Sequence, residues 1–368
     1  MKILVLGGTG AIGVPLVDIL IENGHEVYVT SRRKKFSSNQ LSYIQGNAHD
    51  IKFLKDLLKD KYDIIIDFML YSTHEFEERY NLFLNSCKQY IFTSSCRVFA
   101  NSNQPITEES PRLLDVINDN TYLKTDEYAL SKARQENILL NSQLYNWTII
   151  RPYITYNVER LQLGALEKDI WLKRALSLES VPFPTDISRC YTTLTYARDV
   201  AYCIFKLIDN DKALGECFNI TTSENVQWKK IFDIYRKILN SNQINIITYS
   251  PCNSMDMAEY IGNYYQVKYD RLFNRKFNNS KILNICGNDY RFVSVEEGLD
   301  SCLSQFILSP HWIGPINCKC EAYFDRKSHS FKNFKRFQHK SDFVKYTAWY
   351  YFSKSILLLK NVVGGNRI

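Results

Sequence analysis

One stretch at the start of the chain decides the fold: Lys2-Ile-Leu-Val-Leu6, then Gly7-Gly8-Thr9-Gly10-Ala11-Ile12-Gly13, then Val14-Pro15-Leu16-Val17-Asp18-Ile19-Leu20. An apolar run of strand length ends in glycines, and a helical pattern begins directly after them. Glycines allow the backbone to turn tightly and to approach a pyrophosphate, whose negative charge then lies at the N-terminus of the helix. Gly8, Gly10 and Gly13 fit the pattern G-x-G-x-x-G in the strand–turn–helix context that it requires. The stretch therefore predicts a dinucleotide site.

The length and composition are typical of a soluble globular protein. The 368 residues suffice for two domains, or for one large domain with insertions. Apolar residues make up 45% of the chain and charged residues 23%. The ten cysteines are scattered and show no metal-ligand spacing, so we expect reduced thiols, a cytoplasmic location and no bound metal. Because residue 2 already begins the first predicted strand, we expect no signal peptide.

The positive charge of the chain is concentrated at its C-terminal end. The formal net charge is +7. Residues 311–368 contain eleven Lys and Arg against Glu321, Asp325 and Asp342, a net charge of +8, so the first 310 residues carry −1. The basicity therefore belongs to a C-terminal tail.

The second predicted strand, His25–Thr30, ends in basic residues: Ser31 is followed by Arg32, Arg33 and two lysines. A site for NAD carries Asp or Glu about 20 residues after the glycines, where the acid binds the ribose 2′-hydroxyl. This chain has no acid there, and cations suit a 2′-phosphate. We therefore expect NADP(H) as the cofactor, with NAD as the alternative.

Strand and helix patterns alternate through the first half of the chain. Further strands are predicted at 41–45, 62–68 and 89–99, and helices at 51–60 and 74–88. The strand at 62–68 is a continuous apolar run, as in strands that are buried on both faces. The alternation predicts βαβ units and an α/β fold with a doubly wound parallel sheet of the Rossmann type.

Two further motifs resemble those of a known family. Thr93-Ser94-Ser95-Cys96-Arg97-Val98-Phe99 resembles the S-S-x-x-V-Y-G segment of extended short-chain dehydrogenases, the NAD-dependent epimerases and dehydratases that modify nucleotide sugars. Tyr128-Ala-Leu-Ser-Lys132 resembles the family's Y-x-x-x-K motif. Four other Tyr/Lys pairs have this spacing, but only Tyr128 lies on a helical stretch between the Ser95 strand and the next one. The four-residue spacing places Tyr128 and Lys132 on one helix face.

The resemblance continues to about residue 308. Trp147–Tyr153 resembles the family's L-R-P segment, which passes close to the nicotinamide, and Thr195–Ala201 and Gly215–Thr221 resemble the helix start and the strand that follow. Residues 277–282 and 295–299 resemble its C-terminal elements. The resemblance implies that the dinucleotide is bound by Gly7, Gly8, Thr9, Gly10, Ala11, Ile12, Gly13, Ser31, Arg32, Asn47, Ala48, Phe68, Thr93, Tyr128, Lys132, Pro152 and Tyr153.

The resemblance also implies the chemistry. The catalytic residues are then Tyr128 as general acid/base, Ser95 as hydrogen-bond partner of the substrate oxygen, and Lys132, whose ammonium would lower the tyrosine pKa from about 10. A hydride moves between the cofactor and a carbon of a nucleotide-linked sugar. Related 4,6-dehydratases carry Thr-Asp-Glu where this chain has Ser95-Cys96-Arg97, so the two acids of water elimination are absent. Ketone reduction and epimerisation both remain open.

The tail begins where the resemblance ends. It interleaves Phe with basic residues over 328–340, and its apolar run 343–363 contains three lysines. Three lysines within one span argue against a membrane-spanning helix. They also lie on different helix faces, so we expect a helical appendage that packs on the body or on a second subunit. Peripheral membrane contact is a weaker hypothesis, and nucleic-acid binding is not expected.

The expected organisation has three parts. A dinucleotide-binding domain spans 1–155, with 191–221 returning to it; 156–190 and 222–310 form a smaller substrate lobe; 311–368 form a basic, aromatic extension. The leading hypothesis is an NAD(P)-dependent epimerase or reductase that acts on a nucleotide-linked sugar as a homodimer. The alternative is a non-catalytic protein that senses a dinucleotide and binds nucleic acid or a protein partner through the tail. The joint presence of Ser95, Tyr128 and Lys132 favours the enzyme.

Overall fold

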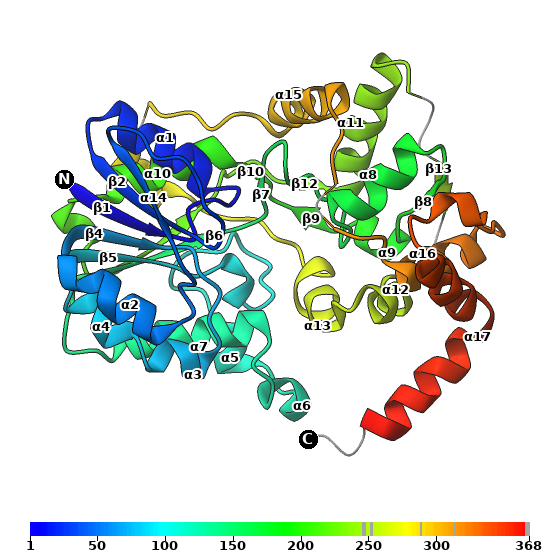
Figure 1. Cartoon of the computed structure of the whole chain (residues 1–368), viewed down its shortest axis with the longest axis horizontal. Coiled ribbons are helices and arrows are strands. Elements are labelled where there is room, and N and C mark those ends of the chain that lie inside the picture. Colours follow the sequence, from blue (N-terminus) through cyan, green and yellow to red (C-terminus); the bar gives the residue numbers. More distant parts are fainter. Residues whose placement is uncertain (245–247, 251–252, 288, 313, 365–368) are drawn as a thin grey trace. The chain divides into compact units, whose positions relative to one another are not determined.

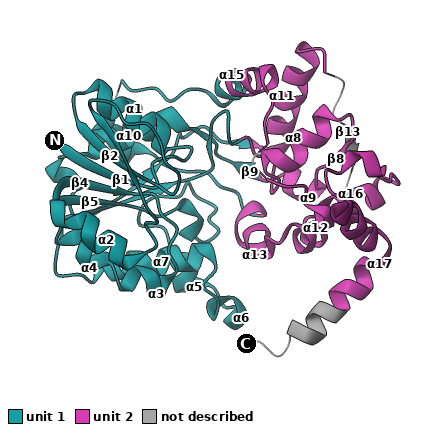
Figure 2. Ribbon diagram, viewed as in Figure 1, with its two compact units in different colours: residues 1–160, 191–226, 273–299 teal, residues 161–190, 227–272, 300–368 magenta. Residues whose placement is uncertain are grey.

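The computed structural model describes residues 1–244, 248–250, 253–287, 289–312 and 314–364. These residues form two compact units, drawn in different colours in Figure 2. Unit 1 contains residues 1–160, 191–226 and 273–299, and unit 2 contains residues 161–190, 227–272 and 300–368.

Unit 1 is built on a seven-stranded parallel sheet with the order β11-β6-β5-β4-β1-β2-β3 (Figure 1). Its strands are β1 (Lys2–Leu6), β2 (Glu26–Ser31), β3 (Leu41–Gln45), β4 (Tyr62–Asp67), β5 (Cys87–Thr93), β6 (Trp147–Pro152) and β11 (Glu216–Ile220). Because β1 pairs with β2 on one side and with β4 on the other, the order reverses between β1 and β4, where ligands bind at the carboxyl ends of such strands. The predicted α/β doubly wound fold is confirmed.

Alternate residues of the strands pack against two helical layers. Ile3 and Val5 belong to a core shared with α1 (Gly13–Glu22), α10 (Ala197–Leu207) and α14 (Ser280–Cys286). Leu4 and Leu6 belong to a second core shared with α2 (Ile51–Leu57), α4 (Tyr80–Leu84) and α7 (Tyr128–Leu140). Figure 1 shows the sheet between these layers. Burial of both faces explains why β1 and β4 are continuous apolar runs.

Two predicted element boundaries are wrong. The helix expected at 74–88 is two short helices, α3 (Thr73–Glu77) and α4, because Arg79 between them has φ −126° and ψ −15°. The strand expected at 89–99 is β5, which ends at Thr93 and is followed by a single 3₁₀ turn, η2 (Cys96–Val98). The other elements of unit 1 are η1 (Leu58–Asp60), α5 (Leu113–Val116), α6 (Asn120–Leu123), β7 (Thr155–Tyr156), β9 (Tyr191–Thr192), β10 (Thr195–Tyr196) and η3 (Asp211–Ala213).

The units differ from the expected domains: residues 156–160 and 222–226, expected in the substrate lobe, belong to unit 1, and two larger segments also differ. The expected lobe includes residues 273–299, but these belong to unit 1, because Ile282 of α14 packs with Val200 and Ile204 in the core beneath the sheet. The expected extension 311–368 is part of unit 2 rather than a separate tail.

Unit 2 is mostly helical. Its elements are α8 (Lys168–Leu176), β8 (Ser180–Pro182), α9 (Thr185–Ser188), α11 (Trp228–Ser241), β13 (Thr248–Ser250), α12 (Ser254–Ile261), α13 (Tyr264–Gln266), η4 (Val267–Arg271), α16 (Cys318–Lys327), η5 (Phe334–Arg336) and α17 (Lys340–Gly364), while β12 (Val226–Gln227) and α15 (Val295–Leu308) begin in unit 1. Trp171 of α8 stacks on Tyr235 of α11 with ring centroids 4.5 Å apart. The C-terminal segment adds a small core of Cys318, Ala322, Phe337 and Tyr346.

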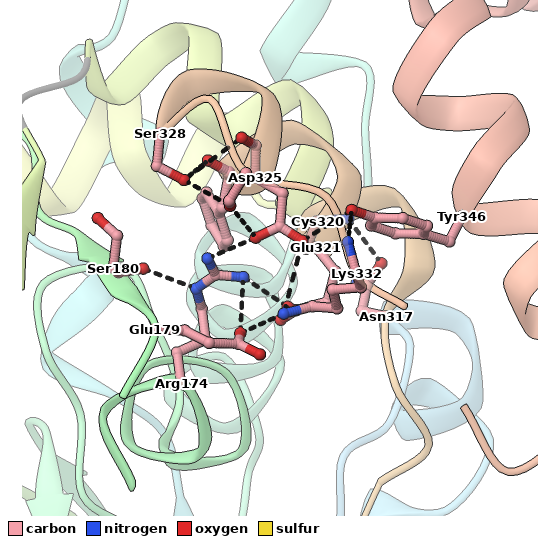
Figure 3. A network of polar contacts seen from close by, with 12 residues as sticks. Arg174, Glu179, Ser180, Asn317, Cys320, Glu321, Asp325, Ser328, Lys332 and Tyr346 are labelled. Atoms are coloured by element: carbon pink, nitrogen blue, oxygen red, sulfur yellow. Dashed lines mark hydrogen bonds and ion pairs between the residues drawn. The ribbon is translucent and has the colours of Figure 1, made fainter. Parts of the chain in front are cut away.

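An ionic network joins the C-terminal segment to α8 (Figure 3). The Arg174 guanidinium, buried in the unit, lies 2.5 Å from a Glu321 carboxylate oxygen and 2.7 Å from one of Asp325. Lys332 bonds to Glu179 and lies 3.0 Å from Glu321, and the Tyr346 hydroxyl donates to Asp325 at 2.9 Å. The three carboxylates are close enough together to share a metal ion, but two cationic side chains already contact them. The network therefore holds the segment in unit 2.

Within the described part of the chain, no helix has both the length and the apolar character needed to cross a bilayer.

Candidate active site

The glycine turn after β1 is shaped by close packing. Gly7 has φ +70°, a conformation that side-chain-bearing residues rarely adopt. A Cβ on Gly13 would lie 2.5 Å from the carbonyl carbon of Gly8, so the start of α1 rests directly on the turn. A Cβ on Gly10 would meet nothing closer than 3.8 Å, the carbonyl oxygen of Gly7. Gly7 and Gly13 are therefore required by the fold, whereas Gly10 keeps open a space next to the turn.

The N-terminus of α1 is available to an anion. Its N-cap residue is Ile12, whose side chain cannot accept a hydrogen bond, and its first turn contains no acidic residue. Backbone N–H groups at such a terminus attract negative charge, as a pyrophosphate would supply. Thr9 is exposed within the turn, and the Ala11 carbonyl oxygen accepts from the Asn157 side chain at 3.3 Å. The turn and the start of α1 thus present backbone N–H groups with no acidic side chain beside them, and the binding of a pyrophosphate there stays a prediction.

The residues expected around the adenosine follow β2 and β3. The Ser31 hydroxyl donates to the Arg33 carbonyl oxygen at 2.8 Å and accepts from the Arg33 N–H at 3.2 Å, so it folds the basic loop back on itself. Arg32 is exposed. Asn47 is exposed and its side chain accepts from the His49 N–H at 3.1 Å, while Ala48 is buried. The Ser31 hydroxyl thus shapes the loop, on which the Arg32 side chain is exposed.

Four further predicted contacts lie at the carboxyl ends of the neighbouring strands. Phe68 follows β4 and donates its backbone N–H to Leu6 of β1 at 3.0 Å. Thr93 ends β5, and its buried hydroxyl has no hydrogen-bond partner among the residues that the structure describes. Pro152 ends β6, and the buried Tyr153 ring lies 5.1 Å from that of Phe277. All four lie on the sheet edge to which the glycine turn belongs.

Ser95 and Tyr128 come together as the sequence predicts. Ser95 follows β5 with an extended backbone, and its hydroxyl accepts from the Arg97 N–H at 3.2 Å. Tyr128 begins α7. Burial raises the pKa of Tyr128, and the charge of Arg97, the neighbouring Ser95 side chain and the charge of Arg160 oppose that rise. The site thus contains a tyrosine beside a serine and two cations.

Arg97 is a site residue that the motif did not identify. Its guanidinium carbon lies 5.0 Å from the centre of the Tyr128 ring, and one of its nitrogens lies 2.5 Å from Glu127, the N-cap residue of α7. It occupies one of the two places where related dehydratases carry acids. The sequence could have identified Arg97 from this substitution, because it places a cation where elimination chemistry needs a carboxylate.

Lys132 lies one helical turn from Tyr128 but has other partners. Its ammonium donates to the Met69 carbonyl oxygen at 3.4 Å and lies 4.6 Å from the centre of the Phe92 ring. Burial lowers its pKa to about 8, and Asp67 and Glu136 oppose that shift. Burial likewise raises the pKa of Asp67 to about 6. The cations that favour the Tyr128 phenolate are therefore Arg97 and Arg160, whereas Lys132 faces the end of β4.

A buried ionic network beneath the site fixes the helix that carries Tyr128 and Lys132. Glu136, four residues beyond Lys132 on the same helix face, accepts from Ser94 at 2.5 Å and from Arg151 at 2.7 and 2.9 Å. Arg112 adds a contact of 3.2 Å to the same carboxylate. The network ties α7 to the ends of β5 and β6. The sequence could have identified Glu136, because it continues the four-residue spacing of Tyr128 and Lys132 along one helix face.

Comparison with known proteins agrees with this architecture. The model of the family described as "NAD dependent epimerase/dehydratase family" matches residues 3–221. The chain is 27% identical over 268 residues to the chloroplast stem-loop binding protein of 41 kDa b of Arabidopsis thaliana, with 68% of this chain and 66% of that protein covered. It is 23% identical over 335 residues to the UDP-N-acetyl-alpha-D-glucosaminuronate decarboxylase of Bacillus cytotoxicus, with 83% and 97% covered.

A solved structure shows the same fold. The Bordetella bronchiseptica enzyme WbmH in complex with NAD⁺ superposes with a TM-score of 0.64 at 13% identity, over 84% of this chain and 100% of that one. The family match spans more than half of the chain and includes the glycine turn, Ser95, Tyr128 and Lys132. The chain therefore belongs to the NAD dependent epimerase/dehydratase family.

Proposed function

We propose that the protein is an NAD(P)-dependent enzyme that reduces a ketone of a nucleotide-linked sugar or epimerises one of its carbons, with Tyr128 as the general acid/base. The observation that carries the proposal is the Arg97 guanidinium carbon 5.0 Å from the centre of the Tyr128 ring, with Ser95 close enough to Tyr128 to oppose the rise of the tyrosine pKa. A tyrosine can transfer a proton near neutral pH only when its surroundings favour the phenolate, and Arg97 does so.

The residues at the sheet edge fit a nicotinamide dinucleotide. Gly10 leaves room that a Cβ would enter, the N–H groups at the start of α1 face it without a polar cap residue, and the buried Thr93 hydroxyl offers a donor and an acceptor. When bound, such a cofactor gives or takes the hydride. The bases for proposing NADP(H), with NAD as the alternative, are the exposed Arg32 and its basic neighbours.

Each of four side chains has a separate role in the proposed reaction. Ser95 would hydrogen-bond to the substrate oxygen and align it, and Tyr128 would give a proton to that oxygen or take one from it. Arg97 would stabilise the tyrosinate through its charge, held in place by Glu127. The Lys132 ammonium contacts the Met69 carbonyl oxygen just after β4 and lies near Asp67. We assign it to positioning the cofactor at that strand end.

The substrate class is proposed from the family and from one relative. The Bacillus cytotoxicus relative is named as acting on a UDP-linked sugar acid. Water elimination is not proposed, because Cys96 and Arg97 stand where related dehydratases carry acids. A homodimer and a cytoplasmic location complete the proposal; analytical ultracentrifugation would test the first.

The test is turnover of a panel of UDP- and dTDP-linked sugars, followed by NADPH absorbance and by NMR of the products. Tyr128→Phe keeps the ring but removes the exchangeable proton, so turnover should fall about 10²–10⁴-fold while the dissociation constant of the cofactor stays nearly unchanged. Tyr202→Phe is the matched control, because Tyr202 and Lys206 share the Y-x-x-x-K spacing on α10. Unchanged turnover in Tyr128→Phe would contradict the assignment.

A second candidate rests on the Arabidopsis relative, which is named as a stem-loop binding protein. The present chain spans 66% of that protein. Under this alternative the protein binds a dinucleotide without turnover and contacts nucleic acid through its basic C-terminal segment. Binding of an RNA hairpin, together with failure to turn over every sugar in the panel, would favour it over the enzyme.

A further inference from the structure

Helix α17 presents an apolar face to solvent. Val344, Tyr351 and Leu358 are 65%, 64% and 66% exposed. Positions 344, 348 and 351 follow one another at spacings of four and three residues, so they share one face of the helix before the kink at Phe352, and the exposed Leu358 lies beyond that kink. Phe352, 63% exposed, lies beside this face at a kink where φ is −117°. Exposed large apolar side chains that gather on one face mark an interaction surface.

The opposite face of α17 fixes the orientation of the helix. Tyr346 is buried among Cys318, Ala322 and Phe337, and its hydroxyl donates to Asp325. Ser353 is buried and bonds to Arg326 of α16. Figure 1 shows α17 beside α16 and continuing beyond it. Val344, Tyr351, Phe352 and Leu358 therefore lie on the outward side of α17.

The exposed charged side chains of the C-terminal segment are mostly basic, because its acids are paired with cations. Glu321 and Asp325 contact Arg174 and Lys332 in the buried network (Figure 3). The third acid, Asp342, lies 3.3 Å from Lys345. The exposed cations of the segment are Lys327, Lys335, Arg336, Lys340, Lys345 and Lys354. Asp256 and Glu259 of α12 are also exposed and line one hollow with Tyr351 and Phe352, but these six cations outnumber them.

We propose that α17 docks on an anionic phospholipid surface, lying in the plane of the interface rather than crossing the bilayer. Val344, Tyr351, Phe352 and Leu358 would enter the boundary between headgroups and acyl chains, and the lysines beside them would reach the phosphates. Charge complementarity selects an anionic partner. The aliphatic side chains select lipid over single-stranded nucleic acid, which gains from aromatic stacking but not from Val344 or Leu358. The proposal is independent of the catalytic site.

The experiment is sedimentation of the full-length protein with phosphatidylcholine vesicles, with and without phosphatidylglycerol, at low and high salt. The protein should sediment with the anionic vesicles, and less so at high salt. The double variant Tyr351→Ser/Phe352→Ser should weaken this partitioning at least tenfold. Tyr145→Ser, which removes an exposed tyrosine of unit 1 (69% exposed), is the matched control and should bind like the native protein.

A second pair of variants tests the charge. Each lysine near an anionic surface contributes about fivefold to binding, so Lys345→Glu/Lys354→Glu should weaken partitioning more than tenfold. Lys59→Glu is the control, because Lys59 pairs with Asp56 at i,i−3 as Lys345 does with Asp342. Circular dichroism should show all these surface variants folded.

Three outcomes would overturn the proposal. One is equal partitioning onto neutral and anionic vesicles, and another is absence of sedimentation with either. The third is that the α17 variants abolish binding of a fluorescent single-stranded RNA, or dissociate a dimer in light scattering, without changing vesicle binding. That result would assign the face to nucleic acid or to a second copy of the chain.

Discussion

The Arg97 guanidinium carbon lies 5.0 Å from the centre of the Tyr128 ring, and Glu127, the residue directly before Tyr128, holds it there at 2.5 Å. The contact couples the 3₁₀ turn after β5 to the first residue of α7. Because burial raises the pKa of Tyr128 and the Arg97 charge opposes that rise, this cation decides how readily the tyrosine ionises.

Replacement of Arg97 should therefore move the pH dependence of activity. Arg97→Gln removes the charge, so the pKa of Tyr128 should rise further and the phenolate should form only at higher pH. We expect the rising limb of kcat/KM against pH to move upward by roughly one unit, a loss of about tenfold at a fixed pH on that limb. Arg198→Gln, at an exposed arginine of α10, should leave the profile unchanged. An unmoved profile in Arg97→Gln would show that this cation does not control the tyrosine.

The glycine turn offers a way to separate folding from cofactor binding. Gly13→Ala places a Cβ 2.5 Å from the backbone of Gly8, so it should lower the free energy of unfolding by about 1–3 kcal/mol. Gly10→Ala meets nothing closer than 3.8 Å, so its unfolding free energy should stay within about 0.5 kcal/mol of the native value. If the pyrophosphate occupies that space, Gly10→Ala should still weaken dinucleotide binding at least tenfold. Urea titration and fluorescence titration measure the two quantities, and native affinity in Gly10→Ala would contradict the proposed seat.

The sheet could be predicted because its signals are local. β1 and β4 contain continuous apolar runs, strand and helix patterns alternate along the chain, and Gly7 to Gly13 mark the first crossover. The proximity of Ser95 to Tyr128 was signalled by motif order, because Ser95 directly follows β5 and Tyr128 begins α7, the helix that leads from β5 to β6. The failures were boundaries, such as the break at Arg79, where a side chain buried by tertiary packing interrupts a helical pattern.

Contacts between residues far apart in the chain could not be predicted from the sequence. Arg174 binds Glu321 and Asp325, about 150 positions further along the chain, and neither spacing nor composition signals such a pairing. For the same reason the segment 311–368 was predicted to be an extension. The partners of Lys132 were also not predictable, because the direction of a buried lysine depends on Asp67 and Met69 of another strand end.

The basic loop after β2 makes cofactor preference testable. Arg32 is exposed beside the end of β2, so we expect tighter binding of NADPH than of NADH. Arg32→Ala removes a charge-assisted contact to the 2′-phosphate, so it should narrow the difference between the two affinities. The affinity for NADPH should fall about tenfold, and the affinity for NADH should change little. Lys59→Ala, at an exposed lysine of η1, controls for the loss of one positive charge. Equal affinities of the native protein for both nucleotides would contradict the prediction.

The network below the site should be a major source of stability. Glu136→Gln leaves the buried Arg151 guanidinium without its carboxylate, and loss of one partner from such a pair costs about 3–5 kcal/mol. Asp115→Asn is the matched control, because Asp115 pairs with Arg112 of the same network but its side chain is 45% exposed. That change should cost at most about 1 kcal/mol. Urea denaturation of both variants measures the difference, and similar small losses would show that the network does not anchor α7.

Removal of the C-terminal segment should unfold part of unit 2 while unit 1 keeps its dinucleotide site. Truncation after residue 310 deletes Glu321, Asp325 and Lys332, which removes two of the carboxylates that contact the Arg174 guanidinium of α8 and leaves it Glu179, 3.4 Å away. Breaking a buried ion pair in this way costs about 3–5 kcal/mol, comparable with the stability of a small domain. Hydrogen exchange read by mass spectrometry should then show lost protection in α8 and α12 but native protection in α1 and β4, with NADPH binding retained. Truncation after Leu358 spares the network and should preserve protection throughout. Native protection of α8 without residues 311–368 would contradict the prediction. The segment would then be a separate extension, and the ionic network would form when the segment docks but would not be needed for unit 2 to fold.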